Sequence, residues 1–464
     1  MRTNTKPYIA PVYTAGGVAA YPHMSPIQAL ERSVLANLLW EDEFYEDGVS
    51  IGDRIKTLCA QVTPEQLAAL AIKARSQFNL RHVPLLLLTQ LVKHSRGKMV
   101  GDTITAVIQR ADEIAEFMSL YLGGADRRIT KVKIAKQVKR GLQAAFQKFD
   151  AYQLAKYDRD YSISLADVAF LVHAKPKKEE MTGLAAKAKP IIKSNYKRGE
   201  VARHLHSNLF KLVTGKLPRP DTWESKLVGG ADKCETFTRQ LKERKLGYLA
   251  LLRNLRGMLE AGVDRDLVIK GIQERRGADR VLPFRYVAAA RACPSLERYI
   301  DTALLESLAG AQKLPGRTVL LVDVSGSMDD PLSSKSDLKR IDAAATLASM
   351  VVGDDVRVFS FSDRLTECPY RLGMAGVDAI IKSQSHSSTR LAEAVTLLNT
   401  LQYDRIIVIT DEQSTSYNRT PDPQGKGYMI NVASNKNGVG YKKWTHIDGF
   451  SEQVLRYIFE SESV

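Results

Sequence analysis

The pattern of apolar residues changes at Arg317, and this change constrains the fold more than any other feature of the sequence. Before Arg317, apolar residues recur at helical spacing and no strand-like alternation interrupts them. After it, short apolar β-branched runs alternate with amphipathic helices; the runs include Thr318–Val324, Val356–Phe361 and Arg405–Thr410. The sequence therefore predicts a helical module followed by an α/β domain.

The helical module is predicted over residues 25–310. Pro64 stands in the first turn of one helix, and Asp102 is predicted to cap a single helix that runs to Gly123. Successive helices of about 10 to 20 residues with short polar breaks fit a solenoid of helical pairs, of the HEAT-repeat kind. Because no sequence repeat is evident, an irregular helical domain is the alternative.

The α/β domain is predicted over residues 316–464. Parallel strands alternating with helices form a doubly wound sheet, in which ligands bind at the carboxyl ends of the strands. The predicted boundary between the two domains is the segment AQKLPG, residues 311–316.

The positive charge of the chain is concentrated in the helical module. The whole chain has 67 Lys and Arg against 52 Asp and Glu, which gives a net charge of +15. From Arg317 onward there are 16 basic and 19 acidic residues, so the preceding residues hold the entire excess. This division indicates that one domain meets a polyanion and the other does not. The alternative is that the charge only keeps the protein in solution.

Three further features concern the compartment. The N-terminal sequence lacks the apolar core of a signal peptide, and no run of about 18 apolar residues suggests a membrane span. The four cysteines are widely scattered, which fits neither a zinc site nor a disulfide framework. We therefore expect a cytoplasmic protein with reduced thiols and no membrane association.

The sharpest motif is a DxSxS sequence directly after the first predicted strand. It consists of Asp323, Ser325 and Ser327. Thr389, at the start of a later helix, and Asp411, at the end of RIIVIT, are predicted to lie at the same edge of the sheet. Hard oxygen ligands of this kind suit Mg²⁺, with Mn²⁺ or Ca²⁺ as alternatives. The competing interpretation is an Asp- and Ser-rich turn that only caps the next helix.

This layout resembles the metal-ion-dependent adhesion site of von Willebrand A domains. The resemblance implies that Ser325, Ser327 and Thr389 bind the metal directly, while Asp323 and Asp411 act partly through water. It also implies that an acidic group of a partner protein completes the metal's shell. Ser388 replaces the family's usual Gly, and Arg390 stands where many relatives have Asp, so its charge would oppose a bound cation.

Three basic stretches, interleaved with Tyr and His, lie in the helical module. They span residues 127–140, 156–178 and 187–206. Such side chains neutralise phosphates and stack on unpaired bases, whereas a single stretch is more often a solvated helix face. The candidate RNA-binding residues are Lys136, Arg140, Lys156, Arg159, His173, Lys175, Lys193, Lys197 and Arg198.

The segment KRGLQAAFQKFDAYQLAKYDRDYSISLADVAFLVHAKPK resembles the centre of the TROVE module of Ro ribonucleoproteins, and the resemblance extends from Ser25 to Leu308. It implies a ring of HEAT-like repeats fastened by the A domain. A basic central hole would admit single-stranded 3′ ends of misfolded or structured RNA. The outer surface would bind small non-coding, Y-type RNA. His173 and Lys175 correspond to the family's RNA-contacting H-x-K-P segment, and its upstream basic cluster begins at Lys156.

The leading hypothesis is a monomeric, non-catalytic RNA-binding protein that acts in RNA quality control within a ribonucleoprotein. The resemblance implies cooperation with an exoribonuclease. A metal-dependent adaptor that binds proteins without RNA is the alternative. A metal-dependent nuclease is disfavoured because the sequence places no obvious general base beside the metal-bound water.

Overall fold

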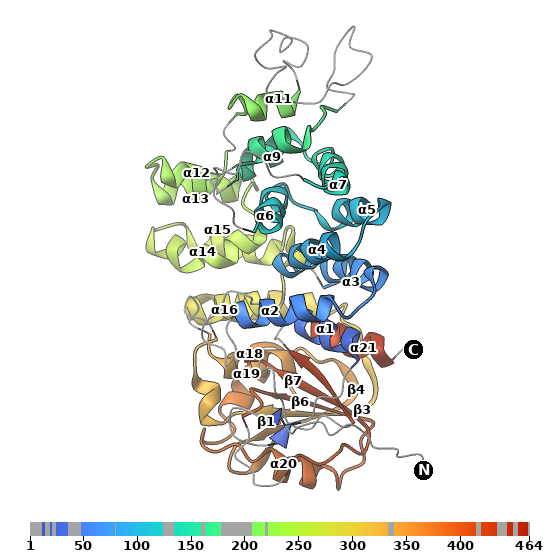
Figure 1. The fold of residues 1–464 in the computed structure, drawn as a ribbon. Helices are drawn as coiled ribbons and strands as arrows, with labels where there is room; N and C mark the ends of the chain where they lie inside the picture. The colour runs from blue at the N-terminus through green and yellow to red at the C-terminus, as the bar shows by residue number, and fades with distance from the viewer. Residues whose placement is uncertain are drawn as a thin grey trace, which may run out of the picture. The chain divides into compact units, whose positions relative to one another are not determined.

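The computed structural model describes residues 12–13, 19–20, 25–35, 48–78, 80–123, 134–158, 163–177, 207–218, 221–332, 338–413, 419–433, 443–448 and 453–462. It divides into two compact units (Figure 1). One unit, called the helical unit here, comprises Gly52–Gly229. The other, called the sheet unit, comprises Met1–Ile51 and Gly230–Val464.

In its described part the helical unit consists of short helices joined by tight turns. The helix Pro64–Ser76 begins with a capping box, in which the Thr63 hydroxyl accepts from the Gln66 backbone N–H and the Gln66 side chain accepts from the Thr63 N–H. The helices are α2 (Gly48–Cys59, which enters from the other unit), α3 (Pro64–Ser76), α4 (His82–His94), α5 (Lys98–Val107), α6 (Asp112–Tyr121), α7 (Lys136–Phe146), α8 (Ala151–Tyr157), α9 (Leu165–Val172), α11 (Asn208–Val213) and α12 (Trp223–Val228).

The predicted single helix from Asp102 to Gly123 is wrong, because the chain forms α5 and α6 with a break between them. The buried carboxylate of Glu113 causes this break: its Oε2 accepts from the backbone N–H groups of Gln109 and Arg110, at 2.8 and 3.0 Å. Its other oxygen accepts from Arg75 at 2.7 Å, so the buried charge is paired. Asp102 lies inside α5 and caps nothing.

Helices α5 and α7 approach each other closely. A Cβ at Gly141 would lie 2.7 Å from the Gly101 carbonyl oxygen and 2.8 Å from the Ile104 Cβ, so only glycine fits there. The Thr105 hydroxyl also donates to the Gly141 carbonyl, at 3.2 Å. This contact fixes α7 against the core and determines which of its faces remains exposed.

The sheet unit contains helices followed by a six-stranded sheet. Its helices before the sheet are α1 (Pro26–Leu35), α13 (Lys233–Lys242), α14 (Tyr248–Glu260), α15 (Arg265–Glu274), α16 (Phe284–Ala292) and α17 (Glu297–Leu308). Its strands are β1 (Val12–Tyr13) and β2 (Ala19–Ala20), which pair with each other, then β3 (Leu314–Asp323), β4 (Gly353–Phe361), β5 (Leu365–Cys368), β6 (Arg405–Thr410), β7 (Lys426–Asn431) and β8 (Trp444–Asp448). Its later helices are α18 (Arg340–Ala348), α19 (Gly373–Ile381), α20 (Leu391–Leu398) and α21 (Gln453–Glu462).

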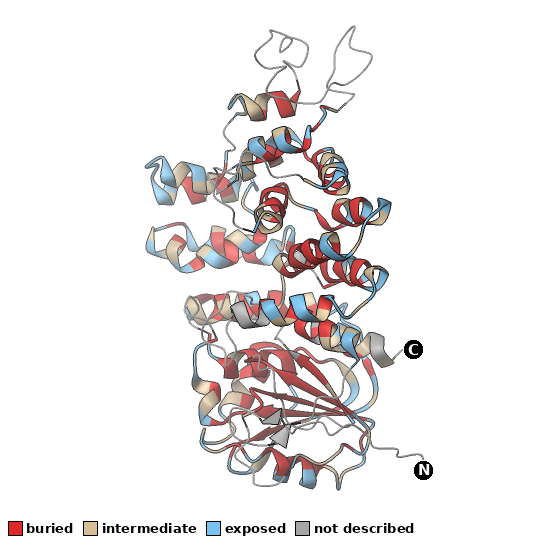
Figure 2. Ribbon diagram, viewed as in Figure 1, coloured by how far each residue is buried: buried red, intermediate tan, exposed pale blue. Residues whose placement is uncertain are grey.

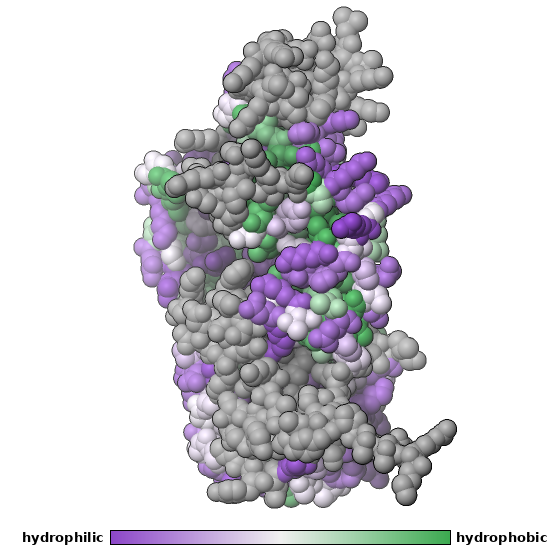
Figure 3. All heavy atoms as spheres, viewed as in Figure 1, coloured by the Kyte–Doolittle hydropathy of each residue, from purple (hydrophilic) through white to green (hydrophobic). Residues whose placement is uncertain are grey.

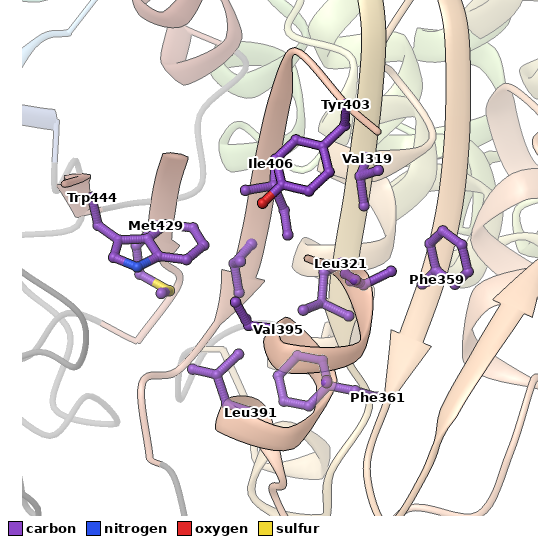
Figure 4. Packing of buried hydrophobic residues seen from close by; sticks show 13 residues of the cluster. Val319, Leu321, Phe359, Phe361, Leu391, Val395, Tyr403, Ile406, Met429 and Trp444 are labelled. Atoms are coloured by element: carbon purple, nitrogen blue, oxygen red, sulfur yellow. The ribbon is translucent and has the colours of Figure 1, made fainter. Parts of the chain in front are cut away.

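The sheet is doubly wound, which confirms the predicted fold class. Its strand order is β5-β4-β3-β6-β7-β8, and every pairing is parallel except that of β5 with β4. Helices α18 and α19 cover one face and α20 covers the other (Figure 1). On the α20 face, Leu391 and Val395 pack against Leu321 and Phe361 (Figure 4). The central strands are buried on both faces (Figure 2), as their continuous apolar runs predicted.

Two further observations concern the expected compartment. All four cysteines lie in the described part of the chain and have free thiols, and burial raises the pKa of Cys59 to about 12. No helix among the described residues has the length and apolarity needed to cross a membrane.

Candidate metal centre and nucleic-acid interface

The predicted metal residues gather at the carboxyl ends of β3 and β6. These strands are neighbours, with Val322 paired to Ile409, although β4 and β5 lie between them in the chain. The strand order reverses between them, and in doubly wound sheets this is where ligands bind. Asp323 and Asp411, which stand at or directly after the ends of these two strands, are both completely buried.

Asp323 is held rigidly by its neighbours. One carboxylate oxygen accepts from the Ser325 backbone N–H at 2.9 Å, and the other accepts from the Thr410 hydroxyl at 2.6 Å. Burial raises the pKa of this carboxyl well above its usual range, and the negative charge of Asp411 raises it further. Two buried carboxylates at this edge are stable as anions only when a positive charge lies close to them.

The hydroxyl ligands lie in two loops that contact each other. The Ser325 and Ser327 hydroxyl oxygens are 3.4 Å apart, within the turn that includes the 3₁₀ helix Gly326–Asp329. The Gly326 N–H donates to the Ser387 carbonyl at 2.9 Å, which ties this turn to the loop that carries the buried Thr389. The donor set of hydroxyls and carboxylates fits a hard divalent cation. Within the described residues, no cluster of three or more His, Cys, Asp or Glu side chains could hold a metal, so a cation at this edge would depend on the hydroxyls.

Sequence reasoning missed the basic residue that faces this edge. Arg340, in the first turn of α18, is buried, and its Nη1 lies 3.5 Å from Asp411 Oδ2 and 3.3 Å from the Ser327 carbonyl oxygen. The residue that the sequence drew attention to, Arg390, has an exposed side chain. Its charge helps to lower the pKa of Asp363 on a neighbouring loop.

A second missed pair holds the loop after β6. Glu412 has a left-handed backbone, with φ 57°, and its buried carboxylate lies 2.7 Å from His446 Nδ1 on β8. The Glu412 N–H donates to the Thr410 hydroxyl, which in turn donates to Asp323. This network fixes the backbone on both sides of Asp411, although neither Glu412 nor His446 belongs to the predicted motif.

In the helical unit, one face of α7 carries two predicted RNA-binding residues and also binds the segment that follows α9. Lys136, Arg140, Gln143 and Gln147 follow at intervals of four, three and four residues, which places them on one face of the helix. The Gln143 amide donates to the carbonyls of Val172 and His173, at 2.6 and 3.2 Å. The Gln147 amide donates to the Lys175 carbonyl at 2.6 Å.

These hydrogen bonds hold the H-x-K-P segment along the C-terminal half of α7, whose same face carries Lys136 and Arg140 nearer its N-terminus. His173 and Lys175 are exposed, whereas Ala174 and Pro176 between and after them are buried. His173 ends α9 in the left-handed conformation, with φ 56° and ψ 51°, where glycine is the usual residue. Hydrophilic side chains cover the surface over α5 and α7 (Figure 3). Lys136, Arg140, His173 and Lys175 are hereafter called the α7–α9 surface.

The remaining predicted RNA-binding residues are not all part of this surface. Lys156 lies on α8, with its Nζ 5.6 Å from the centre of the Tyr157 ring. The Arg110 guanidinium lies 4.8 Å from the same ring centre. Arg159, Lys193, Lys197 and Arg198 lie outside the described residues. Gln143 and Gln147 were missed, because only the tertiary contact of α7 with the segment after α9 reveals their role.

Comparisons with known proteins give one domain match and one shared fold. Residues 213–328 match the TROVE domain family. A segment of 111 residues is 29% identical to telomerase protein component 1 of Mus musculus and 28% identical to that of Rattus norvegicus. This segment is 23% of the chain but only 4% of each of those proteins.

The fold is similar to that of the Ro (Rsr) protein of Deinococcus radiodurans. The crystal structure of that protein aligns with 92% of this chain and 97% of its own chain, with a TM-score of 0.57 and 16% sequence identity. Residues 213–328 of this chain are thus similar to the TROVE domain family, and its fold is similar to that of a Ro protein.

Proposed function

We propose that this protein binds RNA through the α7–α9 surface and acts as a non-catalytic component of a ribonucleoprotein. The observation that carries the proposal is that His173 and Lys175 are exposed on a segment held by Gln143 and Gln147, on the face of α7 that also carries the exposed Lys136 and Arg140. Ammonium and guanidinium groups attract phosphates, and the imidazole stacks on an unpaired base.

The family resemblance extends this proposal to the kind of RNA. Single-stranded 3′ ends of misfolded or structured RNA would enter a basic central hole of the ring, and small Y-type RNA would bind its outer surface. Such a hole selects by shape, because basic walls attract every RNA but only an unpaired end can thread it. The protein would then serve RNA quality control in the cytoplasm as a monomer, in cooperation with an exoribonuclease.

The test compares two RNAs that share one hairpin, of which one ends bluntly and the other carries an unpaired 3′ tail. Binding is measured by fluorescence anisotropy across a salt series. We expect tighter binding of the tailed RNA and an affinity that falls steeply with salt. Weak binding that is indifferent to the tail would contradict the proposal.

A second proposal concerns the sheet edge, where the buried oxygen donors form a preorganised set. We propose that it binds a divalent cation, Mg²⁺ first, through Ser325, Ser327 and Thr389, with Asp323 and Asp411 balancing its charge. When bound, such a cation presents an open position to an acidic group of a partner protein. The competing function, an adaptor without RNA, predicts metal-dependent protein binding together with no RNA affinity.

A further inference from the structure

The side chain of Arg340 brings a buried positive charge to the same edge of the sheet as the predicted cation ligands. Its exposed fraction is only 4%. Its Nη1 contacts Asp411 Oδ2 at 3.5 Å and Asp330 Oδ2 at 3.3 Å, and donates to the carbonyl of Ser327 at 3.3 Å. Two of these three partners, Asp411 and Ser327, belong to the predicted metal set.

The position of this charge is unfavourable unless the acidic groups require it. Arg340 is the first residue of α18, where the positive end of the helix dipole repels a cation. Removing a guanidinium from water is also costly unless its charge is matched. The two buried carboxylates at this edge, Asp323 and Asp411, provide the compensation.

We infer that Arg340 is a built-in counter-ion that competes with a divalent cation for the negative charge of Asp411. This inference rests on the proposed metal centre. The arginine neutralises the edge when no cation is bound, so a cation gains less there than it would at an edge without a basic residue. The affinity for Mg²⁺ or Mn²⁺ is therefore weak, because the cation must overcome repulsion from the guanidinium.

The geometry also indicates what happens to the arginine when a cation binds. Asp330, its other acidic partner, is 58% exposed and lies at the rim of the edge. A cation held by Asp411 would shift the guanidinium toward Asp330, which already contacts the same Nη1 and whose carbonyl accepts from the Arg340 N–H at 3.0 Å. Cation binding is thus coupled to the position of the Arg340 side chain.

A matched control exists in the same unit. Arg405 also has a 4% exposed side chain and pairs with a buried carboxylate, that of Glu462, at 2.7 Å. It stands at the opposite end of the strands, since it is the first residue of β6 whereas Asp411 follows the last. A change at Arg405 therefore removes a buried, paired guanidinium without affecting the charge of the metal edge.

The experiment measures Mn²⁺ binding by isothermal titration calorimetry, and Mn²⁺-dependent melting, on the full chain. Arg340→Gln removes the charge but retains amide donors, Arg340→Lys retains the charge, and Arg405→Gln is the control. We expect Arg340→Gln to bind Mn²⁺ at least tenfold more tightly than wild type. Arg340→Lys should bind like wild type. At one Mn²⁺ concentration, the melting temperature of Arg340→Gln should rise more than that of wild type, and that of Arg405→Gln should rise by the same amount as wild type.

The outcomes separate the inference from the metal centre itself. Equal Mn²⁺ affinity in wild type and Arg340→Gln, with binding lost in Asp323→Ala, would overturn the role of Arg340 and leave the metal centre standing. No binding by either protein would overturn both. If Arg340→Gln does not fold, the wild-type titration decides: a millimolar dissociation constant supports the counter-ion, and a low-micromolar one contradicts it.

Discussion

The sheet edge and the α7–α9 surface both concentrate charge, but in opposite ways. At the edge, the carboxylates of Asp323 and Asp411 are completely buried, fixed by hydrogen bonds, and matched by one buried arginine. On the α7–α9 surface the basic side chains are exposed; Arg140 pairs with the exposed carboxylate of Asp102 at 3.6 Å, and the backbone of the segment after α9 is anchored by Gln143. Buried charges require a ligand of defined geometry, whereas exposed ones suit a polyanion whose phosphates can bind in many registers.

The largest expected effect comes from neutralising the basic surface. Replacing Lys136, Arg140 and Lys175 together with Ala should lower the affinity for tailed RNA by about 100-fold at low salt, because three phosphate contacts are lost. The slope of log affinity against log salt should fall by about two units. Fluorescence anisotropy across a salt series measures both.

The control for that experiment removes the same amount of charge elsewhere. Lys56, Lys226 and Lys270 are exposed, and each lies within 4.0 Å of a carboxylate. Their combined replacement with Ala should lower RNA affinity by no more than about threefold, since none of these lysines belongs to the α7–α9 surface and only the general attraction of the chain for RNA is reduced. Equal losses in the two triple variants would mean that net charge, and not the α7–α9 surface, governs binding.

A smaller effect is expected from Asp323→Asn, which tests the sheet edge. The change should abolish stabilisation by Mn²⁺, which in wild type amounts to about 1.4 kcal/mol at ten times the dissociation constant. RNA affinity should remain at the wild-type value. Thermal melting with Mn²⁺ and with EDTA measures the stabilisation, and anisotropy measures the RNA affinity. A large loss of RNA affinity would show that the sheet edge also contributes to RNA binding.

The sequence predicted the sheet edge better than the surface, for a physical reason. Asp323, Ser325 and Ser327 stand in one turn after a buried strand, and local spacing suffices to place them. Asp411 could be added because parallel strands end at a common edge. Arg340 could not be added, because its contact with Asp411 joins residues that are 71 positions apart in the chain. The edge strands β5 and β8 were also missed, since their short runs carry little periodicity.

In the helical unit, too, the sequence does not predict the features that depend on tertiary contacts. Helical periodicity predicts helices over residues 64–75, 84–92, 131–149, 164–172 and 248–259, and the structure has α3, α4, α7, α9 and α14 there, with bounds that differ by at most five residues. It could not show the break before α6, which depends on the contact of the Glu113 carboxylate with two backbone N–H groups. The neutral side chains of Gln143 and Gln147 carried no signal for nucleic-acid binding, although they hold the exposed residues in place.

A moderate effect is expected from removing that support. Gln143→Leu deletes the donor to the carbonyls of Val172 and His173 without changing any charge. RNA affinity should fall by about fivefold, because the loss of hydrogen bonds worth about 1 kcal/mol loosens the segment. The salt slope should stay unchanged, in contrast to the lysine and arginine variants. An altered slope would show that the glutamine acts through charge, not through position.

The smallest expected effect concerns the backbone of His173. Glycine adopts the left-handed conformation at no steric cost, so His173→Gly should raise the free energy of unfolding by up to about 1 kcal/mol. The same change should weaken RNA binding about threefold, because a stacking ring is lost. Denaturant unfolding and anisotropy on one preparation measure the two effects. If this variant binds RNA as tightly as wild type, His173 only terminates α9 and does not contact RNA.

The central claim is that RNA contacts the exposed basic surface of the helical unit and not the buried acidic edge of the sheet unit. Ultraviolet cross-linking of a tailed hairpin RNA to the full chain, followed by mass spectrometry of the adducts, tests this directly. We predict cross-linked peptides from α7 and from residues 173–177, and none from residues 316–464. Adducts confined to residues 316–464 would contradict the account.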